Sequence, residues 1–408
     1  MKLKSSFVFG ILALASAQMA SAVPIVINIT GATAFRDAAR TAIINFLGGD
    51  GVCLRGAADL NLDGAPTASN LRIMRGFNGG QEYIVRLTHR GSTEGILDTA
   101  DGNTIDFLKA NTVLTATTGA GTIAGATEAG SCENGIPRWS FSDVDKALST
   151  RPNEVFYSTG LPEEDKVGVV PFMFVAGEGA PAGISNMTDQ IFELISSTGA
   201  VNASFFTGAP STTTVVGTGR NNGSGSRATV LSETRYGSFR NVYQYNCVVT
   251  GATENVGALG EVSLFADNGN SGHVSNSGIR AILNRPRTGM TFGGAPFDGV
   301  FVSYLTVSDA TAATGYVPAT GLISGGEGAI PMTYNGVRYS VNNVVNGAYT
   351  LWGYQQFYMV ADATPAEIAF DTALRLALPG NLGSAGIDLG VLNVDRVNGD
   401  GGLIQPQQ

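Results

Sequence analysis

The 408-residue chain has a formal net charge of −9, and 43% of its residues are hydrophobic while only 14% are charged. This composition predicts a globular protein and excludes a disordered one, and the negative charge argues against a nucleic-acid partner. At roughly 100 to 200 residues per domain, the length predicts two to three domains.

The first 22 residues have the pattern of a secretory signal peptide. Lys2 and Lys4 precede an apolar run from Phe7 to Leu14, and Ala20-Ser21-Ala22 is a small-residue cleavage site. We expect cleavage after Ala22 and a soluble mature protein, periplasmic or secreted, without a lipid anchor because no cysteine is near the cut. No later apolar stretch reaches the roughly 20 residues of a membrane helix, so we expect no membrane insertion.

The chain has three cysteines, too few for a disulfide framework. In an oxidising compartment one pair can form. We expect Cys53 to pair with Cys132, because both lie in Gly/Ala-rich insertions, at residues 48–70 and 110–135, that flank early strands. Cys247 is then expected to be a buried thiol.

Four units along the chain each read as a strand, a Gly/Ser/Thr turn and a helix, which is typical of α/β folds. The expected strands are 24–29, 83–87, 138–141 and 213–217. The turns that follow them are 30–33, 91–95, 142–143 and 220–227. In the first unit, apolar residues from Phe35 to Leu47 share one helical face, and Gly48 ends the helix.

Two apolar segments are expected to connect two lobes. Residues 167–175 read as a buried strand that passes between the lobes, and the return is expected at 300–305. This arrangement predicts one lobe from residues 23–165 plus 303–408 and a second lobe from 166–302. Two crossover strands between discontinuous lobes make a hinge.

The four turns place Gly, Ser or Thr where a helix begins. Unpaired N–H groups and helix dipoles at such ends favour an anion, so converging ends predict an anion site. The fourth turn adds Arg220, whose planar fork can bind two oxygens of a tetrahedral oxyanion. Arg36, in the first turn of a helix, also fits a nearby anion. The alternative is that these residues are ordinary helix caps and turns.

At these turns the chain resembles the phosphate-binding proteins of ABC transporters. Arg220-Asn221-Asn222-Gly223-Ser224-Gly225-Ser226 is similar to their Arg-x-Asp-Gly-Ser-Gly-Thr signature. The other segments that resemble the family are, in chain order, Thr30–Phe35, Gly91–Ile96, Phe141–Asp143 and Asn346–Trp352. The resemblance spans residues 25 to 360 in the family's order. It implies a divergent member with the two-lobed type 2 periplasmic-binding-protein fold, a PBP-like domain that closes on phosphate between its lobes.

The resemblance also implies a role for individual residues. Phe35 would donate its backbone N–H, and Thr93 its hydroxyl and its backbone N–H. Ser224, Gly225 and Ser226 would form a nest of donors. Asp143 would accept the proton of a protonated phosphate, and Arg220 would pair with two oxygens. Because sulfate has no such proton at neutral pH, Asp143 would reject it. The full expected set of ligand-binding residues is Thr33, Ala34, Phe35, Ser92, Thr93, Asp143, Arg220, Ser224, Gly225 and Ser226.

Three residues depart from the family pattern. Ala34 stands where a hydroxyl is usual, Asn222 replaces an acid that steadies the arginine, and Glu94 replaces a glycine. A second carboxylate beside a bound anion is unfavourable unless it turns to solvent or meets Arg36 or Arg90.

Taken together, the turns and the resemblance lead us to expect an exported phosphate- or oxyanion-binding protein for ABC-type uptake, with a transporter permease as its partner. The alternative is a secreted surface or matrix protein of the same fold whose site has drifted.

Other motifs are weaker. Asp59, Asn61 and Asp63 fit the start of a calcium loop, but position twelve is Asn70 rather than a bidentate acid, which favours a plain Asp/Gly-rich turn. His89 lies beside the second turn, where it can contact a ligand or be a buried structural histidine, and His273 has no metal-binding spacing. No nucleophile elbow accompanies them, so we expect no enzymatic activity and no cofactor.

Overall fold

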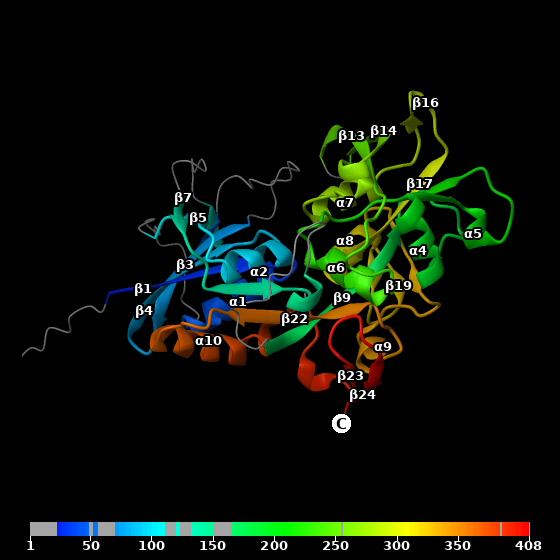
Figure 1. Cartoon of the computed structure of the whole chain (residues 1–408). Helices are drawn as coiled ribbons and strands as arrows, with labels where there is room; N and C mark the ends of the chain where they lie inside the picture. Colours follow the sequence, from blue (N-terminus) through cyan, green and yellow to red (C-terminus); the bar gives the residue numbers. More distant parts are fainter. Residues whose placement is uncertain are drawn as a thin grey trace, which may run out of the picture.

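The computed structural model describes residues 23–48, 52–55, 70–110, 120–122, 132–149, 165–253, 256–383 and 386–407. The expected signal peptide and the candidate calcium loop at Asp59, Asn61 and Asp63 lie outside these residues. The described chain forms two halves that lie side by side and are joined by long strands in the middle (Figure 1).

One mixed sheet runs through both halves in the order β11-β12-β17-β9-β22-β8-β1-β4-β3-β2-β6, with β20 beside β9. Strand β1 is parallel to β4 and β8, whereas β9 is antiparallel to β17 and β22. The strands of the sheet are β1 (Ile25–Gly31), β2 (Val52–Arg55), β3 (Leu71–Asn78), β4 (Gln81–Thr88), β6 (Ala120–Thr122), β8 (Trp139–Ser142), β9 (Asp165–Ala176), β11 (Ala200–Asn202), β12 (Thr214–Gly217), β17 (Gly299–Thr306), β20 (Ile330–Pro331) and β22 (Trp352–Met359).

The helices follow strands of this sheet in most cases, as the sequence predicts. They are α1 (Arg36–Phe46), α2 (Ser92–Ala100), α4 (Asp189–Thr198), α5 (Ser204–Thr207), α6 (Gly225–Glu233), α7 (Asn276–Leu283), α8 (Val307–Thr314), α9 (Val341–Val345) and α10 (Pro365–Ala377). Helix α10 begins with a capping box, in which Thr364 and Glu367 satisfy each other's backbone N–H groups, and Pro365 occupies its first position.

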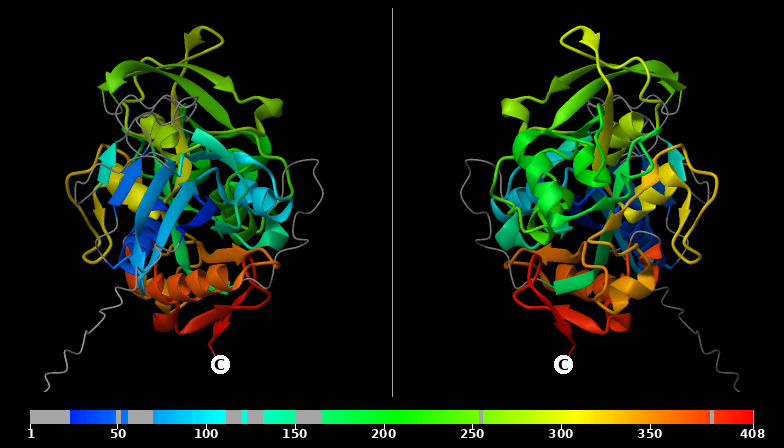
Figure 2. Two further views of the ribbon diagram at one scale, coloured as in Figure 1. Left: turned by 90° about the vertical axis from the view of Figure 1, so that its left-hand side faces the viewer. Right: turned by 90° about the vertical axis from the view of Figure 1, so that its right-hand side faces the viewer.

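Smaller strand pairs complete the fold. Four strands form a separate sheet, β13 (Tyr245–Thr253), β14 (Val256–Leu264), β15 (Thr291–Phe292) and β16 (Ala295–Pro296). The remaining pairs are β5 (Ile105–Leu108) with β7 (Cys132–Gly135), β10 (Asn186–Met187) with β21 (Thr333–Tyr334), β18 (Tyr316–Val317) with β19 (Leu322–Ile323), and β23 (Val394–Arg396) with β24 (Ile404–Pro406). The β23–β24 pair lies at the bottom of the molecule in every view (Figures 1 and 2).

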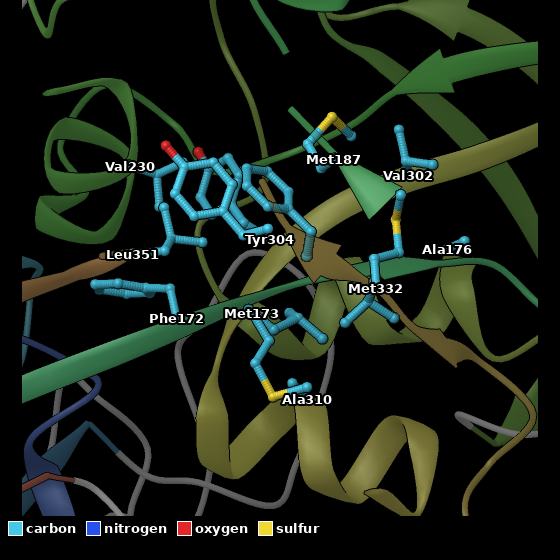
Figure 3. Close-up of a cluster of buried hydrophobic side chains, with 14 of the residues drawn as sticks. Phe172, Met173, Ala176, Met187, Val230, Val302, Tyr304, Ala310, Met332 and Leu351 are labelled. Carbon is cyan, nitrogen blue, oxygen red and sulfur yellow. The ribbon is translucent and has the colours of Figure 1, made fainter. Parts of the chain in front are cut away.

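Each half has its own hydrophobic core. The smaller core lies between the sheet and helices α1 and α10, where Ile43 and Phe46 pack with Phe370. The larger core fills the other half, and in its close-up Val230 of α6 lies beside Leu351 and Phe172 (Figure 3). Two separate cores explain why the chain forms two lobes rather than one body.

Two strands have buried residues in both cores. On β9, Val167 belongs to the smaller core and Phe172 to the larger one; on β22, Phe357 belongs to the smaller core and Trp352 to the larger one. The predicted two-lobed α/β fold with two crossover strands is therefore confirmed. The chain returns at β22, however, and the segment 300–305 lies in β17, whose core residues all belong to the larger core. Lobe boundaries at residues 165 and 303 stay predictions.

The structure tests one of the two expectations about the cysteines. Cys247 is buried, 4% exposed, as predicted. Burial raises the pKa of its thiol, which lowers its reactivity. The side chain of Cys53 lies outside the described side chains, so its pairing with Cys132 stays a prediction.

Candidate functional site

The first three predicted turns lie at one edge of the sheet, because β1 runs parallel to both β4 and β8. Their backbones are joined directly: Ala32 N–H donates to Phe141 O at 2.8 Å, and Gly91 N–H donates to Gly31 O at 3.0 Å. A Cβ on Gly31 would lie 2.0 Å from Phe141 O, so only glycine permits this approach. The carboxyl ends of such strands are where α/β sheets commonly bind ligands.

The first turn leads into α1. Phe35 is fully buried, precedes the first residue of α1, and packs on the ring of Phe141 with centroids 5.1 Å apart. Thr33 and Ala34 are half-buried beside it. The side chain of Phe35, at the N-cap position, does not cap α1.

The second turn starts α2 and contacts the third. Ser92 Oγ accepts a hydrogen bond from the backbone N–H of Asp143 at 3.0 Å. Thr93 is fully buried, and its Oγ1 has no partner among the described residues. A buried hydroxyl without a partner costs free energy, so Thr93 fits a contact with a ligand.

Asp143 lies at the centre of the cluster and is 2% exposed. Its Oδ2 accepts from Ser226 Oγ at 3.2 Å, its backbone carbonyl accepts from Thr229 Oγ1 at 2.7 Å, and its Oδ1 has no partner in the described chain. Burial raises the pKa of Asp143 to about 6, against the opposing effect of the Arg220 charge. This carboxylate can therefore accept a proton from a ligand near neutral pH.

Arg220 is buried, 2% exposed, and the loop before α7 holds its guanidinium. Nε donates to His273 O at 3.2 Å, Nη2 to Val274 O at 2.8 Å and Nη1 to Asn276 Oδ1 at 3.2 Å. These bonds fix the plane of the guanidinium. They orient Arg220 within the same cluster, where its charge acts on Asp143.

The N-terminus of α6 meets the N-terminus of α2. Ser224 caps α6 by accepting from Arg227 N at 3.4 Å. A Cβ on Gly225 would lie 2.2 Å from Ser92 Oγ, and one on Gly223 would lie 3.0 Å from Glu94 Oε1. Two helix N-termini from different halves therefore face each other at this point, which favours negative charge between them.

The structure thus brings together Ser92, Thr93, Asp143, Arg220, Ser224, Gly225 and Ser226. Two residues that support the site, Thr229 and Arg227, match no motif that would have identified them from the sequence. Thr229 ties Asp143 to α6, and Arg227, 4% exposed, donates to Asn270 O at 2.6 Å and to Arg220 O at 3.3 Å. Arg227 therefore fixes the backbone of the arginine that carries the predicted site.

The structure places Glu94, one of the residues that depart from the family pattern, and the two arginines near it. Glu94 packs against Gly223, while Arg90 pairs with Asp98 at 2.9 Å and Arg36 donates to Asn70 Oδ1. The carboxylate of Glu94 thus lies at the junction of the two halves, beside the turn that leads into α6.

Both histidines are buried, and burial lowers the pKa of each. His89 Nδ1 contacts Ala32 O at 2.8 Å, and burial together with Arg72 and Arg36 holds its pKa well below the usual value. Burial and the Arg220 charge lower the pKa of His273 to about 4. Within the described ranges, no three His, Cys, Asp or Glu side chains gather closely enough to hold a metal ion. No helix of the described chain is long and apolar enough to span a membrane.

No protein-family model and no curated protein matches the chain. Its fold is similar to that of an ABC-type phosphate transport receptor from Vibrio cholerae, with 10% identity, 86% of this chain and 93% of the receptor covered, and a TM-score of 0.45. A putative phosphate ABC transporter substrate-binding protein with bound phosphate from Clostridium perfringens gives 12% identity, coverage of 89% and 99%, and a TM-score of 0.46. A possible phosphate binding protein from Planctomyces limnophilus has 10% identity and a TM-score of 0.42, with 90% of this chain and 95% of that protein covered. Because these TM-scores are below 0.5, the ligand of this chain has to be inferred from its own site residues.

Proposed function

We propose that the protein is an exported solute-binding protein that holds phosphate or a related oxyanion between its two halves for ABC-type uptake. The observation that carries the proposal is the position of Asp143. This buried carboxylate, with one oxygen unpartnered in the described chain, lies between the N-termini of α2 and α6 and within the field of Arg220. In this proposal the groups bind the anion and carry out no reaction on it.

The proposed site would supply both affinity and selectivity. N–H groups at the starts of α2 and α6 would donate to the oxyanion, and Arg220 would add a charged, planar donor. The hydroxyl of Thr93 would form a further hydrogen bond with the bound oxyanion. A protonated oxyanion would donate its proton to Asp143, whereas an unprotonated one would meet an uncompensated carboxylate.

The test is the melting temperature of the mature protein with and without phosphate, sulfate, arsenate and a phosphate monoester. A ligand present at 100 times its Kd adds about 2.7 kcal/mol to the free energy of unfolding. We expect a rise with phosphate and none with sulfate at neutral pH. No rise with any of the four, in protein freed of carried-over ligand, would exclude the proposal.

Glu94 favours a second candidate, a secreted surface or matrix protein with a drifted site. Its carboxylate packs against Gly223, next to where an anion would lie. The two candidates differ in oxyanion affinity, because a drifted site predicts no binding at micromolar concentrations.

The substitution Glu94→Gly is expected to tighten phosphate binding by roughly tenfold, because it removes a negative charge near the bound anion. Titration calorimetry of the two proteins measures this difference. Glu193→Gly, at an exposed residue that pairs with Arg240 on the surface, is the control and should leave the affinity unchanged. An unchanged affinity in Glu94→Gly would show that this carboxylate does not act on the ligand.

A further inference from the structure

A buried ionic cluster lies at the end of α6 opposite the candidate site. Glu233, the last residue of α6, forms an ion pair with Arg396, whose Nη1 is 2.7 Å from Glu233 Oε2. The backbone N–H of Gly401 donates to Glu233 Oε1 at 2.7 Å. Arg396 and Gly401 belong to the C-terminal hairpin, residues 394–406, formed by β23, β24 and the turn between them. Helix α6 is thus held by the site at one end and by the hairpin at the other.

Arg396 also fixes the hairpin to the beginning of a crossover strand. Its Nη2 donates to Thr350 O at 2.7 Å and to Trp352 O at 2.9 Å. Its guanidinium lies over the Trp352 ring, 4.0 Å from the centroid. The hairpin is therefore anchored where β22 begins.

Asp400 joins the hairpin to the turn that carries Asp143. Its Oδ2 accepts from the backbone N–H of Asp145 at 2.8 Å, and its Oδ1 accepts from that of Tyr354 on β22, also at 2.8 Å. A Cβ on Gly353 would lie 3.1 Å from Asp143 O and 3.3 Å from Asp400 Oδ1. One carboxylate thus connects the third turn of the site to a crossover strand.

The composition of the cluster also indicates a role in geometry. It buries two carboxylates, Glu233 and Asp400, against one guanidinium, and burial raises the pKa of both acids. The hydroxyl of Tyr334 on β21, which donates to Asp189, also lies 3.2 Å from the backbone carbonyl of Glu233, so the contacts come from several elements. Buried ionic clusters contribute little net stability, because desolvation offsets their attraction.

We propose that the C-terminal hairpin is a clamp for the anion site, with Asp400 and Glu233 as positioning residues. Asp400 holds the turn of Asp143 against β22, and Glu233 holds α6, so both sides of the site keep a fixed relation to one crossover strand. This role rests on the proposed function, since the clamp acts on binding only where the site binds an anion.

The test is Asp400→Asn, because an amide would place its NH2 group opposite one of the two backbone N–H donors. We expect the Kd for inorganic phosphate, measured by titration calorimetry, to rise at least about tenfold. The increase should lie in the dissociation rate, because the bound complex loses a support.

Two controls separate positioning from general destabilisation. Asp395→Asn changes another acid of the same hairpin, which accepts from the Tyr354 hydroxyl and whose side chain is 45% exposed, and should leave the Kd unchanged. Leu374→Ala removes a buried side chain of the smaller core and should lower the Tm without a change in Kd. Wild-type affinity in Asp400→Asn, or an equal loss of affinity in Leu374→Ala, would overturn the clamp.

Hydrogen exchange tests the clamp without a ligand. The amides of Asp145 and Tyr354 should lose at least about tenfold protection in Asp400→Asn and keep it in Asp395→Asn. If the wild-type protein binds no oxyanion but the two variants show this exchange pattern, the proposed function fails, while the hairpin remains a structural connection between the turn of Asp143 and β22. Unchanged exchange at both amides would overturn the clamp itself.

Discussion

Replacing Arg220 with alanine is expected to reduce phosphate affinity by at least about 100-fold. Hydrogen bonds to charged groups contribute about 1.5 to 3 kcal/mol each, and the substitution removes two of them, which corresponds to a factor of roughly 100 or more. Titration calorimetry with inorganic phosphate measures the loss.

Because Arg220 is buried and bonded to the loop before α7, its truncation will also lower the Tm. Arg86→Ala is a matched control, since Arg86 is 5% exposed and donates to Asn28, Leu108 and Glu133 away from the site. Both variants should lose stability, and only Arg220→Ala should lose phosphate. Retained phosphate binding in Arg220→Ala would exclude the site.

Replacing Asp143 with asparagine is expected to admit sulfate. In the wild type, sulfate should raise the Tm only below about pH 6, where Asp143 is protonated and no longer repels it. In Asp143→Asn the sulfate effect should persist unchanged from pH 5 to pH 8, because the neutral amide does not titrate. Thermal melts with sulfate across this range measure the difference.

Asp371→Asn is the control, because Asp371 is a buried acid of α10 whose partners are Arg375 and the Trp139 indole N–H rather than residues of the candidate site. It should keep the wild-type pH dependence of the sulfate effect. A wild-type profile in Asp143→Asn would remove the assigned role of this carboxylate in selectivity.

Local patterns predicted much of the fold and the cluster. The strand–turn–helix units around Ser92 and Ser224 form as expected, because each depends on neighbouring residues, whereas the strand before Asp143 leads only into the short 3-10 turn Lys146–Leu148. The return of the chain at β22 was not predictable in this way. The apolar segment 300–305 and the segment 352–359 both suit a buried strand, and only packing against two cores distinguishes them.

The residues that support the site could not be predicted from the sequence either. Arg220 is held by carbonyls of His273 and Val274, and backbone acceptors leave no trace in residue types. Asp400 lies in a Gly/Asp-rich turn that reads as solvent-exposed, yet it is 6% exposed because residues far away in the chain cover it.

The division of the smaller core has a consequence for the order of folding during synthesis. This core needs Phe357, Phe370 and Leu374 from the last part of the chain as well as residues from the first. A nascent chain that has been made only to residue 350 therefore lacks one wall of its N-terminal half and cannot complete it. The N-terminal half, although it is made first, is therefore completed only after most of the larger core has been synthesised.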